Sequence, residues 1–405
     1  MADRHGSGFR SVTRLAEARE RLLDGVSPHG RTEHVPLEEA DGEILAESVV
    51  ADRAIPHYER AAMDGYAVRA TDTHGASDRS PHRLTVVSES PGSGEAVHVN
   101  TGQALPDGAD AVVMVEDVTE RDGDIDVGVA VAPGENVSPI GEDVPAGREL
   151  FGAGRRLEPA DVALLTAAGV REVPIRTPPT VAVIPTGEEL VAADPDPGEV
   201  VETNGRMVAD LVERWGGQAV KRGIVTDNRD RLAAAIERDR DCDLVVTIGG
   251  SSVGERDLVP AVLDERGEMD VHGVAIKPGH PVGFGAVDGT RVLVLPGYPV
   301  SAYVTATQLL RPAVAAAGGY DPPAIRTREA TLAGKIASEP GVRTFARVSD
   351  VADDPDRVEA LRVAGASVLS SVTDADGWVV VPESVEGYAA GETVTVEEWW
   401  SYCRL

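Results

Sequence analysis

The sequence predicts a multidomain protein in which an α/β domain is combined with β-rich parts. The chain has 405 residues, which is enough for several domains. Between residues 180 and 319, apolar strand-like runs alternate with helical patterns, which indicates βαβ units and a mostly parallel sheet with both faces covered. Residues 82–137 and the segment after Pro323 contain short alternating runs separated by turn residues, which indicates β structure.

The individual elements follow from these patterns in chain order. Amphipathic patterns occur at residues 12–23 and 37–49, and a helix is predicted at 158–168 because Gly169 follows it as a typical C′ glycine. In the α/β part, helices are predicted at 204–215, 229–238 and 299–317, and strands at 181–184, 219–225, 244–248, 271–276, 282–287 and 291–295. Strands predicted at 342–348, 359–363, 378–381 and 393–396 indicate a small barrel at the C-terminal end.

The segment from Thr247 to Asp257, TIGGSSVGERD, is the clearest candidate for a binding loop. Glycines let the backbone approach a ligand and adopt positive φ, and backbone N–H groups that precede a helix bind anions. The pattern therefore favours a phosphate site with a cation held near Asp257. The alternative is a tight strand-to-helix turn whose polar residues are solvated.

Acidic residues follow three strands of the predicted sheet: Glu188 and Glu189, then Asp227, then Asp257. In a parallel sheet the carboxyl ends of the strands lie at one edge, where ligands bind. Carboxylates beside a phosphate loop suit Mg²⁺. Each acid on its own is also typical of a helix N-cap or a solvated loop.

Two further turns carry residues that suit an anion. Lys277 follows a strand and can neutralise a phosphate or a similar oxyanion, although a solvated lysine is the alternative. His280 binds an anion only when it is protonated and is otherwise structural. The turn from Pro296 to Pro299 leads to a helix whose first N–H groups and Ser301 can bind an anion, or it is simply a helix start.

The charge balance restricts the partners of the protein. The chain has 68 acidic and 38 basic residues, a formal net charge of −30, and its only lysines are Lys221, Lys277 and Lys335. This excess of acids argues against binding to duplex nucleic acid or to an anionic membrane. An acidic surface that is poor in lysine is typical of a high-salt cytoplasm, because salt screens the repulsion between acids. The alternative is an acidic protein from an ordinary cytoplasm.

The cysteines and the N-terminal residues favour a cytoplasmic location. Residues 1–11 are polar and lack the apolar core of a signal peptide, and no run approaches ~18 apolar residues. Cys242 and Cys403 match no metal or redox spacing, which indicates a reducing compartment.

Eight motifs occur together in a fixed order. They are MDGYA at 63–67, TGQALPDGADAVVMVE at 101–116, GED at 141–143, PTGEEL at 185–190, GGSSVGERD at 249–257, KPGHP at 277–281, PGYPVS at 296–301, and a closing segment from LSS at 369–371 to VPE at 381–383. In this combination, over residues 12–397, the chain resembles the molybdopterin molybdenumtransferase family, which includes MoeA and the gephyrin E-domain.

The resemblance implies an elongated homodimer whose subunits have four domains. These are a discontinuous linking domain (1–55 and 138–178), a β-rich domain (56–137), an α/β molybdopterin-binding domain (179–320) and a C-terminal β-barrel (321–405). The implied activity is insertion of molybdate, or tungstate, into adenylylated molybdopterin with release of AMP. The implied cleft lies between the α/β domain of one subunit and the β-rich domain of the other, and Mg²⁺ is the expected cofactor.

The resemblance also implies roles for individual residues. The expected catalytic residues are Asp64, Thr101, Asp143, Asp227, Asp257 and Lys277, and the expected Mg²⁺ ligands are Glu189, Asp227 and Asp257. The expected substrate-binding residues are Gly249, Gly250, Ser251, Ser252, Gly254, Pro296, Pro299, Ser301, Arg343 and Ser370. The chain departs from the family pattern at Ser138, Gly273, His280 and Tyr298, where basic or amide side chains are common.

Two other functions stay open from the sequence. Molybdopterin adenylylation uses a related α/β domain with a similar glycine-rich loop, although the MDGYA domain and the terminal barrel favour the later step. A non-catalytic dimeric scaffold is the other alternative, and in that case the loop acids would be dispensable.

Overall fold

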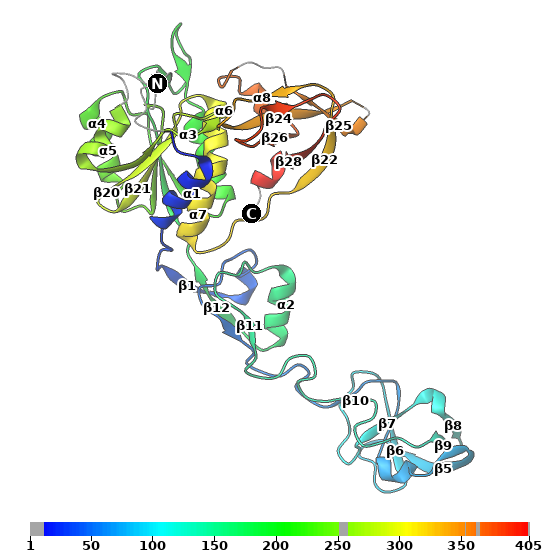
Figure 1. Ribbon diagram of the computed structural model, residues 1–405. Coiled ribbons are helices and arrows are strands. Elements are labelled where there is room, and N and C mark those ends of the chain that lie inside the picture. The colour runs from blue at the N-terminus through cyan, green and yellow to red at the C-terminus, as the bar shows by residue number, and fades with distance from the viewer. Residues whose placement is uncertain (1–11, 251–257, 353, 362–364, 404–405) are drawn as a thin grey trace. The chain divides into compact units, whose positions relative to one another are not determined.

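The computed structural model describes residues 12–250, 258–352, 354–361 and 365–403 (Figure 1). The chain separates into two compact units: Thr32–Ile175 is one, and the residues before and after it form the other. Each unit is described by itself. The four domain boundaries expected from the sequence stay a prediction.

The larger unit contains a six-stranded sheet, within the described residues, of order β16-β13-β17-β21-β20-β18. Its strands are β13 (Thr180–Pro185), β16 (Gln218–Lys221), β17 (Leu244–Ile248), β18 (Gly267–His272), β20 (Gly283–Val287) and β21 (Thr290–Leu295). Strands β16, β13, β17 and β21 run parallel, and β20 and β18 complete the sheet in antiparallel pairings. The predicted α/β domain with a mostly parallel sheet is confirmed.

Helices cover both faces of this sheet. Successive side chains of a strand point to opposite faces, so neighbouring residues of β13 enter two different cores. Val181 and Val183 belong to a core with α1 (Leu15–Asp24), α3 (Asn204–Arg214), α6 (Pro299–Thr305) and α7 (Arg311–Gly318). Ala182 and Ile184 belong to a second core, with α4 (Arg229–Arg238) and α5 (Leu258–Arg266) (Figure 1). This double burial explains why the strands are almost continuously apolar.

The long helix expected at 299–317 is interrupted. A π-helical turn, η4 (Ala306–Leu310), separates α6 from α7, and Pro312 lies in the first turn of α7. A proline ring clashes with the carbonyl of the residue four positions earlier, here Gln308. The wider turn is consistent with that clash, and the Gln308 carbonyl accepts a hydrogen bond from Arg19 Nε at 3.1 Å instead.

Two other expected elements are shorter than the sequence suggested. The helical part of the amphipathic stretch at 37–49 is only a 3₁₀ turn, η1 (Leu37–Glu39); Gly42, with φ of 81°, is not helical, and Val49 begins β2. The strand expected at 271–276 is divided between β18 and β19 (Ile276–Lys277), with Gly273 at φ of 95° between them.

The C-terminal strands close into a five-stranded barrel, as expected. They are β22 (Thr327–Leu332), β24 (Arg343–Val351), β25 (Asp354–Ala360), β26 (Gly377–Val381) and β28 (Thr393–Glu398). Strand β24 pairs with both β25 and β26, which joins the two ends of the sheet. The α/β domain contributes β19, which pairs in parallel with the start of β24.

An aromatic cluster connects the barrel to the α/β domain. Tyr303 on α6 stacks on Trp399 with ring centroids 4.7 Å apart and meets the edge of Trp378 at 6.4 Å. Trp378 also contacts Phe345 at 5.0 Å and Tyr402 at 4.7 Å. Aromatic residues are only 4% of the chain, so the cluster concentrates scarce side chains at this contact.

The smaller unit has a six-stranded sheet, within the described residues, of order β7-β4-β6-β5-β9-β8, and a separate part around α2 (Pro159–Ala167). The sheet strands are β4 (Gly65–Val68), β5 (Ser77–Val87), β6 (Glu95–Val99), β7 (Ala111–Met114), β8 (Val118–Arg121) and β9 (Asp124–Val129). The α2 part contains the strand pairs β1 (Thr32–Pro36) with β12 (Glu172–Arg176) and β2 (Val49–Val50) with β11 (Glu149–Phe151). Leu45, Leu157 and Leu165 form its core.

The remaining elements are short. They are β3 (Arg60–Ala61), β10 (Val137–Ser138), β14 (Leu190–Val191), β15 (Val200–Val201), β23 (Ile336–Ala337), β27 (Gly387–Tyr388), α8 (Ser370–Thr373), η2 (Ala70–Thr73), η3 (Val115–Asp117) and η5 (Trp399–Cys403). Among the described residues, no helix has the length and apolar character needed to cross a membrane.

We predict that Trp378→Ala lowers the free energy of unfolding by about 3–5 kcal/mol, because it removes a fully buried ring from the aromatic cluster. It also removes the donor that binds Glu397 Oε2 at 2.6 Å. Denaturant unfolding followed by circular dichroism measures the change. Tyr298→Ala is the matched control, since Tyr298 is 63% exposed and should cost less than about 0.5 kcal/mol. Equal losses in the two variants would contradict the prediction.

Candidate functional site

The candidate site lies at the edge of the α/β sheet where three parallel strands end. The ends are in register, because Pro185 pairs with Ile248 and Ile248 pairs with Leu295. Backbone hydrogen bonds continue one residue further, from Thr186 N to Ile248 O at 2.9 Å and from Gly249 N to Leu295 O at 3.0 Å. The loops after β13, β17 and β21 therefore begin side by side.

Gly249 is required by the geometry of this edge. Its φ is 104°, and a Cβ at this position would lie 2.2 Å from the carbonyl oxygen of Thr186. Gly250 also has positive φ, at 63°, and a Cβ on Gly297 would lie 3.5 Å from Gly249 Cα. The backbones of the loops thus approach so closely that side chains are excluded, which lets a ligand come close to the backbone of the turn. Ser251, Ser252, Gly254 and Asp257 lie outside the described residues.

Two of the predicted acids lie on this edge. Asp227 Oδ1 accepts a hydrogen bond from Thr186 Oγ1 at 3.3 Å. The carboxylate of Glu189 occupies the space into which a side chain at Gly187 would project. Both acids therefore contact the turn that follows β13. Among the described residues, no group of three or more His, Cys, Asp or Glu is placed to hold a metal ion.

Thr186 and Asn204 are two residues of this edge that the sequence analysis did not single out. Asn204 begins α3, and its Nδ2 donates to the carbonyl of Gly297 at 2.6 Å. Its Oδ1 is buried with no hydrogen-bond partner among the described residues. Their positions after the ends of strands could have pointed to both residues. Their contacts could not be found in this way, because they join loops that are distant in the sequence.

Lys277 lies beside the barrel rather than on the glycine loop. The pairing of β19 with β24 places Ile276 opposite Arg343 and Lys277 opposite Thr344. Lys277 Nζ contacts Glu339 Oε1 at 2.7 Å, and both side chains are exposed. The hydrogen bond from Lys277 lowers the pKa of Glu339, so this carboxylate is charged at neutral pH.

Arg343 has a carboxylate partner of its own. Its Nη2 contacts Glu383 Oε2 at 2.9 Å. The two cations therefore lie one register position apart on adjoining strands, each paired with one glutamate. Ser370, which begins α8, is exposed, and no contact joins it to Arg343 within the described part of the chain.

The turn from Pro296 to Pro299 lies between the glycine edge and the turn that follows Lys277. Pro296 is buried and Pro299 is the first residue of α6. Ser301 is also buried, and its carbonyl accepts a hydrogen bond from Thr305 Oγ1 at 2.7 Å. A Cβ on Gly279 would lie 3.6 Å from the same carbonyl, so the turn after Lys277 packs against α6.

Asp64, Thr101 and Asp143 belong to the smaller unit. Asp64 Oδ1 accepts two hydrogen bonds from Thr101, from the backbone N at 2.6 Å and from Oγ1 at 2.9 Å. These bonds lower the pKa of Asp64, the backbone bond contributing most. Asp143 is exposed, its N donates to Ile55 O at 3.0 Å, and its O accepts from Arg148 Nη1 at 3.2 Å.

Family models match three successive segments of the chain. Residues 13–169 match the MoeA N-terminal region (domains I and II), residues 182–316 a probable molybdopterin-binding domain, and residues 329–399 the MoeA C-terminal region (domain IV). A protein of Haemophilus influenzae named molybdopterin molybdenumtransferase is 34% identical over 95% of this chain and 98% of its own length. The chain belongs to the MoeA family.

Other MoeA relatives agree with this assignment. A Bacillus subtilis protein named molybdopterin molybdenumtransferase is 32% identical over 91% of this chain and 90% of its own length. A crystal structure of the molybdopterin biosynthesis MoeA protein from Pyrococcus horikosii matches with a TM-score of 0.82 and 36% identity, covering 96% of this chain and 99% of that chain. The multidomain MoeA fold expected from the sequence is thus confirmed.

The four positions at which the sequence predicts departures from the family pattern have the following surroundings in this MoeA chain. Ser138 is buried and its Oγ donates to Glu142 Oε2 at 2.5 Å, which connects it to the GED turn. Gly273 has φ of 95°, a conformation that would strain any side chain in its place. Tyr298 is exposed before α6. His280 is half-buried, and its carbonyl accepts a hydrogen bond from Val274 N at 3.0 Å.

We predict that His280 is neutral at pH 7, because burial lowers its pKa from the ordinary value, against a smaller opposing effect of a backbone hydrogen bond to Val274. The histidine then adds no positive charge to the turn after Lys277. NMR titration of the imidazole signals measures the midpoint, and the signal that disappears in His280→Gln identifies the residue. A midpoint at or above about 6.5 would contradict the prediction.

Proposed function

We propose that this protein inserts molybdate, or tungstate, into adenylylated molybdopterin and releases AMP. The supporting observation is the arrangement of the sheet edge. The glycine turn at Gly249 and Gly250 suits the phosphates, and Lys277 and Arg343, at adjoining register positions of β19 and β24, suit an oxyanion. The relatives named molybdopterin molybdenumtransferase match nearly the whole chain and support the same reaction.

The nucleotide part of the proposed site is formed by the loops after β13 and β17. Backbone N–H groups that follow Gly249 would bind phosphate oxygens, and Asn204 Oδ1 would accept a hydrogen bond from the substrate. Asp227 and Glu189 offer carboxylates to a Mg²⁺ ion together with Asp257, a donor set that this ion prefers. When bound, Mg²⁺ would offset the negative charge on the phosphate oxygens.

Removal of divalent ions with EDTA should therefore stop AMP release.

The oxyanion part is formed by Lys277 and Arg343. Each is already paired with a glutamate, Glu339 or Glu383, so an incoming oxyanion would replace a carboxylate partner rather than meet a free cation. The Lys277 pair is exposed on both sides and exposed pairs contribute only about 0–1 kcal/mol, so it would exchange partners easily. Close approach of the oxyanion to the dithiolene sulfurs would supply the remaining rate enhancement.

We predict that Lys277→Ala slows molybdate-dependent AMP release about 10²-fold, a typical loss when one preorganised charge donor is removed. Lys335→Ala is the matched control, because Lys335 is another exposed lysine of this lysine-poor chain. Purified protein in molar salt is mixed with adenylylated molybdopterin and molybdate, and AMP is measured by chromatography. Equal rates in the two variants would remove Lys277 from the proposed site.

The same preparation separates the alternative functions. A molybdopterin adenylyltransferase would form adenylylated molybdopterin from ATP and molybdopterin without molybdate. A non-catalytic scaffold would release no AMP, and Lys277→Ala would change nothing. We rank the insertion reaction first because the relatives with this enzyme name cover both units of the chain.

We also propose that the protein is a homodimer, as the family resemblance implies. Asp64 and Thr101 form a preorganised carboxylate in the smaller unit, and in the proposed dimer they would complete the site of the other subunit. Light scattering in molar salt tests this assembly. A monomeric mass with full AMP-releasing activity would exclude it.

We further propose that the protein is adapted to high salt, on the basis of its formal net charge of −30. We predict that its melting temperature rises from about 0.15 M to about 1 M KCl, since the Debye length falls from about 8 Å to about 3 Å and repulsion between acids is screened. Differential scanning calorimetry measures this rise. Near pH 4.5, where carboxylates begin to be protonated, the rise should shrink. A melting temperature that does not depend on KCl would contradict the adaptation.

A further inference from the structure

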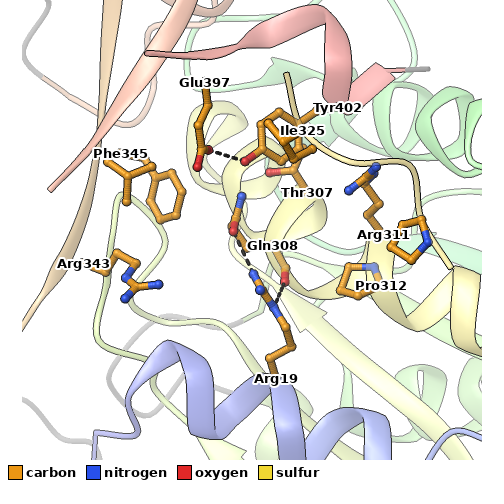
Figure 2. A pocket seen from close by; sticks show the side chains of 12 residues that line it. Arg19, Thr307, Gln308, Arg311, Pro312, Ile325, Arg343, Phe345, Glu397 and Tyr402 are labelled. Atoms are coloured by element: carbon orange, nitrogen blue, oxygen red, sulfur yellow. Dashed lines mark hydrogen bonds between the residues drawn. The ribbon is translucent and has the colours of Figure 1, made fainter. Parts of the chain in front are cut away.

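A pocket lies between α1, the η4–α7 segment and the C-terminal barrel (Figure 2). Its volume is about 250 Å³. Its charged lining residues are Arg19 on α1, Arg311 on α7, Arg343 on β24 and Glu397 on β28. Figure 2 shows that the three arginines come from three different elements.

The one carboxylate in this lining is already engaged. Glu397 Oε2 accepts a hydrogen bond from Trp378 Nε1 at 2.6 Å and another from the hydroxyl of Tyr402. Burial and the nearby Glu397 raise the pKa of Tyr402, so its hydroxyl stays protonated and continues to donate. Glu397 is therefore committed to two neutral donors.

Arg19 has only neutral acceptors as hydrogen-bond partners in the described chain. It donates to the side-chain Oε1 of Gln308 at 2.9 Å and to the Gln308 carbonyl at 3.1 Å. Burial lowers the pKa of Arg19 most strongly; the charge of Arg343 acts in the same direction, and Tyr402 and Glu397 act in the opposite one. A guanidinium held in this way gains from a carboxylate or phosphate that matches its planar donors.

Gln308 provides a further unused donor. Its Nε2 is buried and forms no hydrogen bond of normal geometry in the described chain, although Gln308 lies close enough to the Tyr402 hydroxyl to lower the pKa of that group. Gln308 belongs to the π-helical turn η4, and such turns are frequent at functional sites. Arg311 contributes as well: it is buried, it donates to Pro323 O at 2.5 Å, and it lies 5.7 Å from the ring centre of Tyr402.

The rest of the lining is apolar. Pro312, Pro322, Ile325, Phe345 and Val380 contribute carbon surface to the pocket. A bare inorganic ion would leave this surface without a partner, whereas a ligand that carries one charged group on a compact apolar body would cover both kinds of lining.

We propose that this pocket binds a small organic anion, a carboxylate or a phosphate monoester attached to a compact apolar body. The anionic group lies against Arg19 and Gln308, and the apolar body lies against Phe345 and Ile325. The pocket shares Arg343 with the proposed oxyanion site, but binding of this ligand does not require the molybdenum chemistry.

Titration calorimetry with benzoate and with phenyl phosphate tests the proposal on the full-length protein. Arg19→Gln should weaken binding of the better probe at least 10-fold. Arg21→Gln, on the same helix but exposed and paired with Glu17, should change the affinity less than 2-fold. The stronger of the two probes indicates whether the natural group is a carboxylate or a phosphate. Benzyl alcohol and inorganic phosphate, which each lack one half of the ligand, should bind much more weakly.

Two measurements keep the test independent of folding and of the other site. Arg19→Lys keeps the charge and should bind more tightly than Arg19→Gln, with both variants shown to be folded by circular dichroism. Lys277→Ala should bind the probe like the wild-type protein. No binding of either probe to the wild-type protein, equal binding by Arg19→Gln, or loss of binding in Lys277→Ala would overturn the proposal.

Discussion

The pairing of β19 with β24 is the constraint on which the candidate site depends. It consists of Ile276 opposite Arg343 and Lys277 opposite Thr344, with Arg343 N donating to Ala275 O at 2.9 Å. Two residues of strand pairing are marginal on their own. The aromatic cluster centred on Trp378 supplies the stable packing, and the short pairing then sets where Lys277 and Arg343 lie. Two cations thus become neighbours although 66 positions separate them in the sequence.

The fold was predictable where a pattern has a physical period and a clear end. Helix α4 has the predicted limits, Arg229–Arg238, because its apolar face is regular and Asn228 caps it by accepting a hydrogen bond from Arg231 N at 3.0 Å. The antiparallel direction of β20 and β18 was not predictable, because a short apolar run has no direction. The π-helical turn at Ala306–Leu310 was not predictable either, because one additional residue in a single turn hardly changes the apolar pattern of a helix.

The candidate site was predictable where residue type alone restricts the backbone. Gly249 follows a buried strand, and only glycine tolerates both its φ and the close Thr186 carbonyl. Asp227 was found because acids after strand ends converge on one edge. The roles of Thr186 and Asn204 were not predictable, since they arise from contacts between loops. The pairing of Lys277 with Glu339 joins residues 62 positions apart, and no local pattern encodes it.

Two elements extend from the candidate site to the arginine-lined pocket. The α6–η4–α7 segment begins at Pro299, beside the glycine edge, and contains Gln308 and Arg311 in the pocket wall. Strand β24 begins at Arg343, beside Lys277, and continues to Phe345 in the same wall. If an anion in the pocket changes the affinity of the candidate site for its oxyanion, the oxyanion changes the affinity of the pocket by the same factor, because coupling between binding sites is reciprocal. Arg343 lines the pocket and also belongs to the proposed oxyanion site, so an anion bound beside Arg19 would share this cation with the oxyanion. The two anions repel each other, so the coupling expected from charge alone is negative, and only a rearrangement of α6–η4–α7 would reverse its sign.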